Sequence, residues 1–544
     1  MKYIRFYIRE ISRFGWTYVL VLFCQLLMVA LSLAYVWLSK RIVDAAIMLH
    51  QNPGSGSRGL VACAAVFAVL ALLRPSVVAV KSYFQSKMSV NMANDLRLRL
   101  FDRLLHLKNE HLRKYHSGDM LNRLQVDVSS IASTFCSSVP DLFWAAVQFL
   151  AAFAYLLVID SRLAWILILI IPLAILGGRY VMFRVRDLTL DIRRSDSEVQ
   201  SHIQESVQHL TLLQTLEYTG NSSESLCELQ ADNYSKNMRR ARFSVAAHTL
   251  VAFSFTVGYA VAFLWGAFGI AAGTVTYGVM TAILQLVGQV QRPLVQASDR
   301  LPSLLHCTAS IDRIEEIAGL PQESASARHF LDGIAGVCLE HLTFRYHDGS
   351  SDVLSNLSFD FAPGSKTAIV GPTGIGKSTL IRLMLSLLTP TSGSVSIYSA
   401  SERLLASEST RCNLVYVPQG NTLFSGTVRE NLQMGDPHAS EQRMAEALHI
   451  AAADFVLDLP AGLDTPCFEQ GGGLSEGQAQ RIAIARALLR PGSILLLDEF
   501  SSALDSATED LLLRRLTEAL TGRTMIFITH RDRVIDYCDS VLRL

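Results

Sequence analysis

A glycine-rich loop at residues 371–379 has the residue types and the spacing best suited to chemistry. Its sequence, GPTGIGKST, fits the pattern G-x-x-x-x-G-K-[ST] and follows a short apolar run typical of a strand. Glycines let backbone N–H groups surround a phosphate, Lys377 adds a positive charge, and Ser378 offers a hydroxyl to Mg²⁺. The pattern predicts a nucleotide-phosphate site, with a plain glycine-rich turn as the alternative. The residues predicted to bind the nucleotide here are Gly371, Thr373, Gly374, Gly376, Lys377, Ser378 and Thr379.

A second strand-like run, residues 493–499, is apolar at 494–497 and ends in two adjacent carboxylates. An uninterrupted apolar run of this length is typical of a buried parallel strand. Such a strand would deliver both carboxylates to the phosphate site. Asp498 would then hold the metal ion, and Glu499 would polarise the attacking water.

Between the loop and the acidic run, residues 474–481 read LSEGQAQR. Here the chain resembles the ATP-binding cassette (ABC) superfamily, which places an LSGGQ-like signature just ahead of the acidic strand. The resemblance implies that Ser475, Gly477 and Gln478 contact ATP bound by another cassette. Glu476 departs from the family pattern, because most relatives have a glycine there. Ser475 and Gln478 also fit a helix capping box, in which an acid at the first helical position favours the helix dipole.

Further residues match motifs of the same family in the family's order. The resemblance implies that Tyr346 stacks on adenine and that Gln419 belongs to the glutamine loop. It also implies that Asp505 belongs to the D-loop and that His530 is the switch histidine. Taken singly, Tyr346 could be a strand aromatic, Gln419 a loop amide and His530 a strand end. The implied catalytic residues are Glu499 and His530, and the implied Mg²⁺ ligands are Ser378, Gln419 and Asp498.

The first part of the chain is far more apolar than the part that carries these motifs. Half of the 544 residues are hydrophobic, and the surplus lies almost entirely before residue 300. Most of the long apolar stretches reach the ~20 residues that a helix needs to cross a bilayer, although the sixth is short. The predicted spans are residues 16–38, 60–80, 135–158, 163–183, 245–270 and 275–290. Gln285 and Gln289 share one face of the sixth span, where they would either line a cavity or bind a neighbouring helix.

Charge predicts how these spans are oriented. Lys and Arg are frequent before the first span and in the two long loops, and they are scarce in the three short loops. By the positive-inside rule, both termini and the ATPase domain are therefore cytoplasmic. The chain is predicted to be an integral, multi-pass membrane protein, with a bacterial plasma membrane favoured.

The two long loops match the exporter branch of the family, in which membrane spans extend into the cytosol as helical hairpins. In that branch each hairpin tip is a short coupling helix that docks on a nucleotide domain. The candidates are residues 111–118 and 209–218, and Glu469 resembles an acid that contacts such a helix. A solvated helix turn without a partner is the alternative for each tip.

The predicted domains are a transmembrane domain at residues 1–318, a linker at 319–335 and a nucleotide-binding ATPase domain at 336–544. The fold class is an α-helical six-span membrane domain with long cytoplasmic helical hairpins, followed by an α/β P-loop ATPase domain of the ABC type.

The resemblance implies a half-transporter that uses ATP and Mg²⁺ to export an unidentified, amphipathic cargo. One chain has one nucleotide loop and one signature, so a second half-transporter is expected as partner. A homodimer is favoured because no catalytic position is lost, and a heterodimer stays open. The other expected partners are the lipid bilayer and a small-molecule, lipid or peptide cargo. A formal net charge of zero suggests no nucleic-acid partner. The alternative function is an ATP-gated or regulatory membrane protein without net pumping.

Overall fold

The computed structural model describes residues 2–51, 58–112, 115, 117–323, 327–346, 351–468 and 473–544. Its contacts divide the chain into two compact units. The first unit comprises Met1–Phe101 and Gly118–Ala318, and the second comprises Asp102–Ser117 and Gly319–Leu544. The tip of the first long loop therefore belongs to the second unit. Glu469 and part of the first predicted coupling helix lie outside the described residues.

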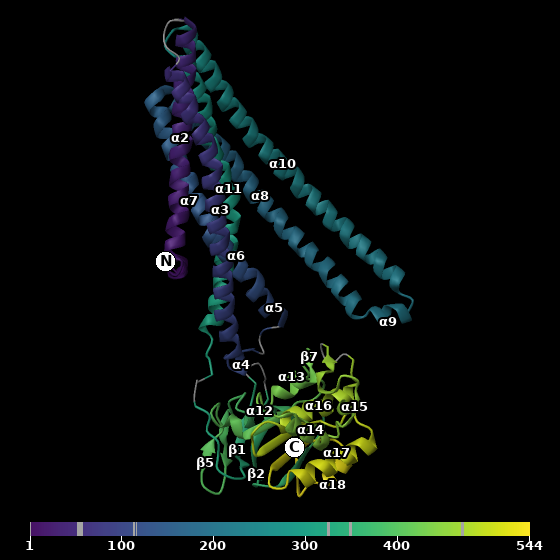
Figure 1. Ribbon diagram of the computed structural model, residues 1–544. Helices are drawn as coiled ribbons and strands as arrows, with labels where there is room; N and C mark the ends of the chain where they lie inside the picture. Colours follow the sequence, from purple (N-terminus) through teal and green to yellow (C-terminus); the bar gives the residue numbers. More distant parts are fainter. Residues whose placement is uncertain are drawn as a thin grey trace. The chain divides into compact units, whose positions relative to one another are not determined.

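The first unit is built from long helices (Figure 1). Its helices are α1 (Lys2–Ser12), α2 (Gly15–Gln51), α3 (Arg58–Leu105), α5 (Ser117–Asn122), α6 (Val128–Ser133), α7 (Val139–Ile159), α8 (Ser161–Gln208), α9 (Leu210–Thr215), α10 (Thr219–Ala271) and α11 (Tyr277–Gly319). Single π-helical turns, Arg123–Asp127 and Thr134–Ser138, flank α6 and join it to α5 and α7. Helices α8 and α10 run side by side, with α9 at the tip of this hairpin (Figure 1).

Four segments among the described residues are long and apolar enough to cross a membrane. They are α2, α3, the segment Gly118–Ile159 and the Ala252–Ala271 part of α10. The predicted span 163–183 lies on α8, where the side chains of residues 167–186 are outside the described set. The predicted span 275–290 overlaps α11, which is not among the four. The count of six spans stays a prediction.

A buried group of amides joins three of the helices. Gln148 Nε2 on α7 donates to Gln289 Oε1 on α11 at 2.9 Å, and Ser32 Oγ on α2 donates to Gln148 Oε1 at 3.0 Å. Gln289 Nε2 in turn donates to the Ser32 carbonyl at 3.3 Å. The sequence left two roles open for Gln289, lining a cavity or binding a neighbouring helix, and these hydrogen bonds show that it binds neighbouring helices. Membrane proteins pair polar groups in this way when water is absent.

Glycines let α11 approach its neighbours closely. Gly278 N donates to Asp44 Oδ1 on α2 at 3.0 Å. A Cβ at Gly278 would overlap the Lys40 carbonyl oxygen and would lie 2.5 Å from Asp44 Cγ. On α10, a Cβ at Gly266 would lie 2.9 Å from Met280 Cγ on α11. Small residues at such crossings are a common feature of packed membrane helices.

We expect Gly278→Ala to lower the thermal stability of the full-length protein, because its methyl group would force α2 and α11 apart. Overpacking of this kind costs about 1–3 kcal/mol. Gly288→Ala on the same helix is the matched control, since nothing lies within 4 Å of a Cβ there. Alanine is favoured over glycine in helices by ~1 kcal/mol, so the control should be neutral or stabilising. Equal melting temperatures for the two variants would contradict the close contact.

The second unit is an α/β domain with two main sheets. Its strands are β1 (Gly336–Phe344), β2 (Leu354–Phe361), β3 (Lys366–Val370), β4 (Ser392–Tyr398), β5 (Arg403–Leu405), β6 (Leu414–Val417), β7 (Gly426–Thr427), β8 (Pro466–Cys467), β9 (Ile494–Asp498), β10 (Thr524–Ile528) and β11 (Ser540–Arg543). Its helices are α4 (Asn109–Leu112), α12 (Lys377–Met384), α13 (Val428–Gln433), α14 (Glu441–Ile450), α15 (Phe455–Asp458), α16 (Glu476–Leu488), α17 (Ser506–Ala519) and α18 (Asp532–Asp536).

One sheet is parallel, with the order β11-β3-β10-β9-β6, and the other is antiparallel, with the order β2-β1-β4-β5. Every residue of β9 and β10 is buried, as expected for central parallel strands covered on both faces. The helical unit and the α/β unit agree with the predicted fold class.

The tip of the first long loop is attached by backbone hydrogen bonds to residues 322 and 323, in the predicted linker, which the contacts place in the second unit. Leu107 pairs with Gln322 in an antiparallel bridge, and Glu323 N donates to the His106 carbonyl at 2.7 Å. Glu110 Oε1, on α4, accepts from Thr389 N at 2.6 Å. This tip, unlike a solvated turn, therefore has partners within the second unit.

Candidate nucleotide site

The carboxyl edge of the parallel sheet brings the predicted residues together. The glycine-rich loop follows β3, and Gln419 follows β6. Asp498 ends β9, whose neighbour β10 is followed by His530. These four strands are adjacent in the order β3-β10-β9-β6, so the segments that follow them emerge at the same edge. Ligand sites of open α/β sheets lie at this edge.

The glycine-rich loop is shaped by a residue that only glycine suits well. Gly376 has φ of 116°, and a Cβ there would lie 2.9 Å from Val353 Cγ1. It forms the N-cap of α12, so the N–H groups at the start of that helix border the loop. Lys377, 6% exposed, donates through Nζ to the Gly371 carbonyl at 2.7 Å. Burial lowers the pKa of Lys377.

Tyr346 lies beside the helix that follows the loop. Its hydroxyl is 3.0 Å from Thr379 Oγ1, and its ring packs edge-on against Phe344. Thr379 itself is buried, whereas Thr373 and Gly374 are exposed at the front of the loop. The structure therefore places the predicted adenine-stacking ring next to the predicted phosphate loop.

Asp498 is the buried carboxylate of the site, with 4% exposure. Burial raises its pKa, and the neighbouring charge of Glu499 acts in the same direction. Hydrogen bonds from Tyr416, at 3.3 Å, and from Ser378 oppose this shift. The predicted Mg²⁺ ligands are a carboxylate, a hydroxyl and the amide of Gln419. Since Mg²⁺ prefers oxygen ligands and keeps several waters, this donor set fits the ion.

Glu499 is held between two of the predicted residues. Gln419 Nε2 donates to Glu499 Oε2 at 2.6 Å, and His530 Nε2 lies 3.3 Å from Glu499 Oε1. His530 Nε2 is also 2.6 Å from Lys377 Nζ. Glu499 has φ of 44°, an unusual backbone conformation for a residue other than glycine, and such conformations cluster at functional sites. Its N–H donates to the Ile528 carbonyl at 3.0 Å, which fixes it against β10.

The signature forms the start of α16. Ser475 caps the helix, since its side chain accepts from Gln478 N while Gln478 Oε1 accepts from Ser475 N at 2.9 Å. The capping box is therefore confirmed, and Glu476 is exposed at the first helical position. A Cβ at Gly477 would lie 2.7 Å from the Ala503 carbonyl oxygen, so glycine allows α16 to contact the D-loop.

The predicted ATP-contacting residues of the signature, Ser475, Gly477 and Gln478, and the D-loop residue Asp505 form no hydrogen bond with Glu499 in the described part of the chain. Asp505 caps α17 by accepting from Thr508 N, from the Thr508 hydroxyl and from Ala507 N, and these hydrogen bonds hold its pKa below the usual range. Within the described ranges, no hydrogen bond or ion pair joins Ser475, Gly477 or Gln478 to the loop at 371–379. A single chain thus carries the nucleotide loop and the signature as separate surfaces.

Comparison with known proteins identifies the family. A family model described as the ABC transporter transmembrane region matches residues 18–294, and one described as ABC transporter matches residues 354–502. The chain belongs to the ABC transporter family. A membrane domain and an ATP-binding cassette in one chain is the arrangement that the sequence predicted.

Named relatives of this ABC transporter include lipid transporters. A "Fatty acid ABC transporter ATP-binding/permease protein" of Mycobacterium tuberculosis is 31% identical over 82% of this chain and 71% of the relative. An "ATP-dependent lipid A-core flippase" of Pseudomonas fluorescens is 29% identical over 85% of this chain and 77% of the relative. A solved bacterial Atm1-family ABC exporter with ATP bound has a TM-score of 0.80 at 23% identity, covering 96% of this chain and 92% of that one. This similarity confirms the predicted fold class, a helical membrane domain followed by an α/β cassette, and leaves the count of six spans as a prediction.

Sequence reasoning missed three residues that support the site in this ABC transporter. Tyr416 contacts Asp498, and Gln480 Nε2 donates to the Glu499 carbonyl at 3.3 Å. Arg531 donates to the carbonyls of Ser502 and Leu504 and to Glu509, and so holds the D-loop. Two of these residues could have been suspected from their place in the sequence. Tyr416 shortly precedes Gln419, and Arg531 directly follows His530.

We expect Asp498→Asn to raise the melting temperature of the full-length protein at pH 8 when nucleotide and Mg²⁺ are absent. The pKa of Asp498 is raised in the folded state, so the folded protein holds a proton more tightly than the unfolded chain does. Stability is therefore lost as the pH rises through the raised pKa, and the amide avoids that loss. The gain should be smaller at pH 4 than at pH 8.

Asp505→Asn is the matched control, because the pKa of Asp505 is lowered rather than raised. Its charged form contributes stability above the unfolded pKa, and this contribution is lost as the pH falls. The control variant should therefore melt at the same or a lower temperature at pH 8. An Asp498→Asn protein that is less stable at both pH values would contradict the unfavourable burial of this carboxylate.

Proposed function

We propose that this protein is an ATP-driven half-transporter that exports an amphipathic substrate as a dimer. Lys377, Gln419, Glu499 and His530 gather at one sheet edge, and this gathering carries the proposal. Among the described residues, Ser475, Gly477 and Gln478 of the signature form no hydrogen bond with the nucleotide loop of the same chain. A cassette of this kind needs a second one, because the signature of each subunit would complete the nucleotide site of the other.

The catalytic roles follow from the contacts. Glu499 would accept a proton from the attacking water, since its carboxylate is held at the site by Gln419 and His530. Lys377 would neutralise phosphate charge and His530 would sense it. Mg²⁺, held by Asp498, Ser378 and Gln419, would stabilise the charge on the phosphates when bound. Hydrolysis and phosphate release would then reopen the dimer.

The second hairpin tip supports a dimer. The helix α9 and its flanks expose large apolar side chains: Leu210, Leu212, Leu216 and Tyr218 are each more than half exposed. Apolar groups gathered at the end of a long hairpin favour burial against another surface. The cassette of the second subunit is the surface we propose, and a second copy of this chain is favoured because each catalytic position is retained.

The cargo class is proposed from the relatives and the membrane domain. The named relatives act on fatty acids and on lipid A-core, which are amphiphiles. Both termini and the cassette would be cytoplasmic in a bacterial plasma membrane, as the charge distribution predicts. An ATP-gated membrane protein is the alternative, and net flux into inverted vesicles separates the two functions. A panel of drug, lipid, peptide and thiol cargoes should give ATP-dependent uptake of at least one amphiphile.

We expect Glu499→Gln to lower ATP hydrolysis by about 10²–10⁴-fold while leaving ATP binding within a few-fold, because the amide keeps the shape of the site but accepts no proton. Purified full-length protein with Mg²⁺-ATP provides the measurement. Lys377→Ala is the contrasting variant and should weaken ATP binding itself. Hydrolysis by Glu499→Gln within a few-fold of the unmodified protein would reject Glu499 as the base.

We expect Glu476→Gly to lower the ATP concentration for half-maximal hydrolysis by a few-fold. A carboxylate about 6 Å from a phosphate charge costs roughly 3 kcal/mol at an effective dielectric of 20, and under 1 kcal/mol when water fills the gap. The exposure of Glu476 favours the smaller cost. Salt screens this repulsion, so the effect should be larger at low salt.

Glu476→Gln and Glu441→Gln form the matched pair of controls. The first removes the charge and keeps the size of the side chain at the signature. The second removes an acid from the same first helical position of α14, which follows its own serine cap. Only the first should change the ATP dependence. If Glu476→Gly, Glu476→Gln and Glu441→Gln all have the same ATP concentration for half-maximal hydrolysis, at low and at high salt, then Glu476 serves only in capping the helix.

A further inference from the structure

A cavity of about 1060 Å³ lies among five helices of the first unit. It is bordered by Trp37 and Lys40 on α2, the turn between α7 and α8, the end of α10 and the start of α11. These are the short-loop ends of the helices, opposite to the hairpin tip at α9 (Figure 1). By the charge distribution this is the predicted outer end of the membrane domain.

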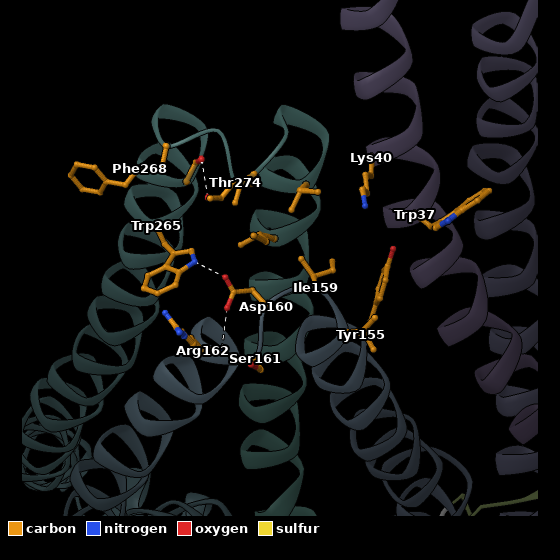
Figure 2. Close-up of a pocket in the computed structure, with 16 residues that line it drawn as sticks. Trp37, Lys40, Tyr155, Ile159, Asp160, Ser161, Arg162, Trp265, Phe268 and Thr274 are labelled. Carbon is orange, nitrogen blue, oxygen red and sulfur yellow. Dashed lines mark hydrogen bonds between the residues drawn. The ribbon is translucent and has the colours of Figure 1, made fainter.

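Aromatic and aliphatic side chains form most of the wall. Trp37 and Tyr155 lie on one side of the cavity, and Trp265 and Phe268 lie on the other (Figure 2). Trp37 is 48% exposed and Phe268 is 73% exposed, so the cavity opens to the surroundings of the bundle. Its volume is that of sites that hold small organic ligands, which are mostly apolar with a few placed polar groups.

The charged groups of the cavity are two cations and one carboxylate. Asp160 is already engaged, since Oδ2 accepts from Trp265 Nε1 at 2.8 Å and Oδ1 accepts from Arg162 N and Leu163 N at the start of α8 (Figure 2). In the part of the chain that the structure describes, the side chains of Lys40 and Arg162 form no ion pair or hydrogen bond. The wall therefore carries two cations against one carboxylate, which leaves a net charge of +1.

Lys40 is held in place by the contact between α2 and α11. Its carbonyl group faces Gly278, where no larger residue fits, and Asp44 one turn later accepts from Gly278 N. Asp44 is thus engaged with the backbone of α11. The Lys40 ammonium lies across the opening from Asp160 and Trp265 (Figure 2).

We propose that this cavity binds an amphiphile with an anionic head group, a carboxylate or a phosphate ester on a hydrocarbon chain. Lys40 and Arg162 would contact the head group, and Trp37, Tyr155 and Trp265 would contact the first part of the chain. An anion on a hydrocarbon chain matches this wall, because the two cations attract its head group and the aromatic side chains can cover its apolar chain. Without a ligand site, the same residues would only anchor the helices at the interface, as aromatic belts and extended lysines do.

The test uses tryptophan fluorescence, because two of the five tryptophans line the cavity. In full-length protein with Trp16, Trp144 and Trp165 replaced by Phe, the remaining signal comes from Trp37 and Trp265. The protein is placed in neutral-lipid nanodiscs without ATP. It is titrated with an ω-bromo fatty acid, an ω-bromoalkyl phosphate and an ω-bromoalkyl trimethylammonium of equal chain length, since bromine quenches tryptophan on contact.

We expect saturable quenching by at least one anion at a concentration about tenfold lower than for the cation. Preference for the carboxylate identifies a fatty acid as the source, and preference for the phosphate identifies a phospholipid head group. Lys40→Gln and Arg162→Gln should each raise the half-quenching concentration of the preferred anion several-fold. Lys40→Arg should restore it, which separates binding from damage to the fold.

Arg58→Gln is the charge-matched control, because Arg58 starts α3 at the same end of the helices and does not line the cavity. It should leave the titrations unchanged. Equal quenching by all three probes, or quenching that neither Lys40→Gln nor Arg162→Gln alters, would overturn the proposal and leave the residues as interface anchors. The measurement needs no hydrolysis, so its failure would not bear on ATP-driven export, and a failure of export would not bear on this binding.

Discussion

The register between β9 and β10 is the constraint on which the nucleotide site depends. Asp498 is aligned with Ile528, so the segments after the two strands leave the sheet at the same level. Glu499 then takes its unusual backbone conformation and donates to the Ile528 carbonyl, and His530 comes within 3.3 Å of its carboxylate. A shift of one residue would turn side chains to the other face of the sheet and separate these groups.

Asp498 and Lys377 are buried at this edge of the sheet, and the surrounding protein offsets only part of the cost of burying their charges. The pKa of Asp498 is raised and that of Lys377 is lowered, and burial is the leading cause of both shifts. Each shift means that the charged form is less favourable than it would be in water. A bound phosphate chain with its metal ion carries the opposite charges at both positions. Nucleotide binding would therefore relieve an unfavourable state of the folded cassette, which links binding to its conformation.

Much of this site was predictable because its motifs are local. The glycine-rich loop and the capping box of Ser475 and Gln478 are each defined by residues within one short segment. Their geometry follows from backbone rules that do not depend on the rest of the fold. The family resemblance then ordered the remaining segments, and the parallel sheet explains why residues far apart in sequence meet at one edge.

The supporting contacts were not predictable, since each joins distant elements. Tyr416 reaches Asp498 from a neighbouring strand, and Arg531 holds carbonyls of a loop that precedes it by more than twenty residues. The role of Gln289 likewise depends on Gln148 and Ser32, which lie on other helices. Periodicity placed Gln289 on a helix face but contained no information about the helix that the face would meet.

The charged side chains of the membrane domain are of two kinds: those paired between helices and those available to a ligand. The Glu10 carboxylate, 1% exposed, forms an ion pair with Arg99 at 2.5 Å, and this pair joins α1 to α3. Asp141 on α7 forms ion pairs with Lys81 on α3, at 3.3 Å, and with Arg300 on α11, at 3.0 Å, and so joins three helices. Lys40 and Arg162 differ from these residues, because the carboxylate beside them is bound to an indole and to a helix N-terminus. These ion pairs hold helices together, whereas Lys40 and Arg162 form no ion pair in the described part of the chain and remain able to meet an anion from the bilayer.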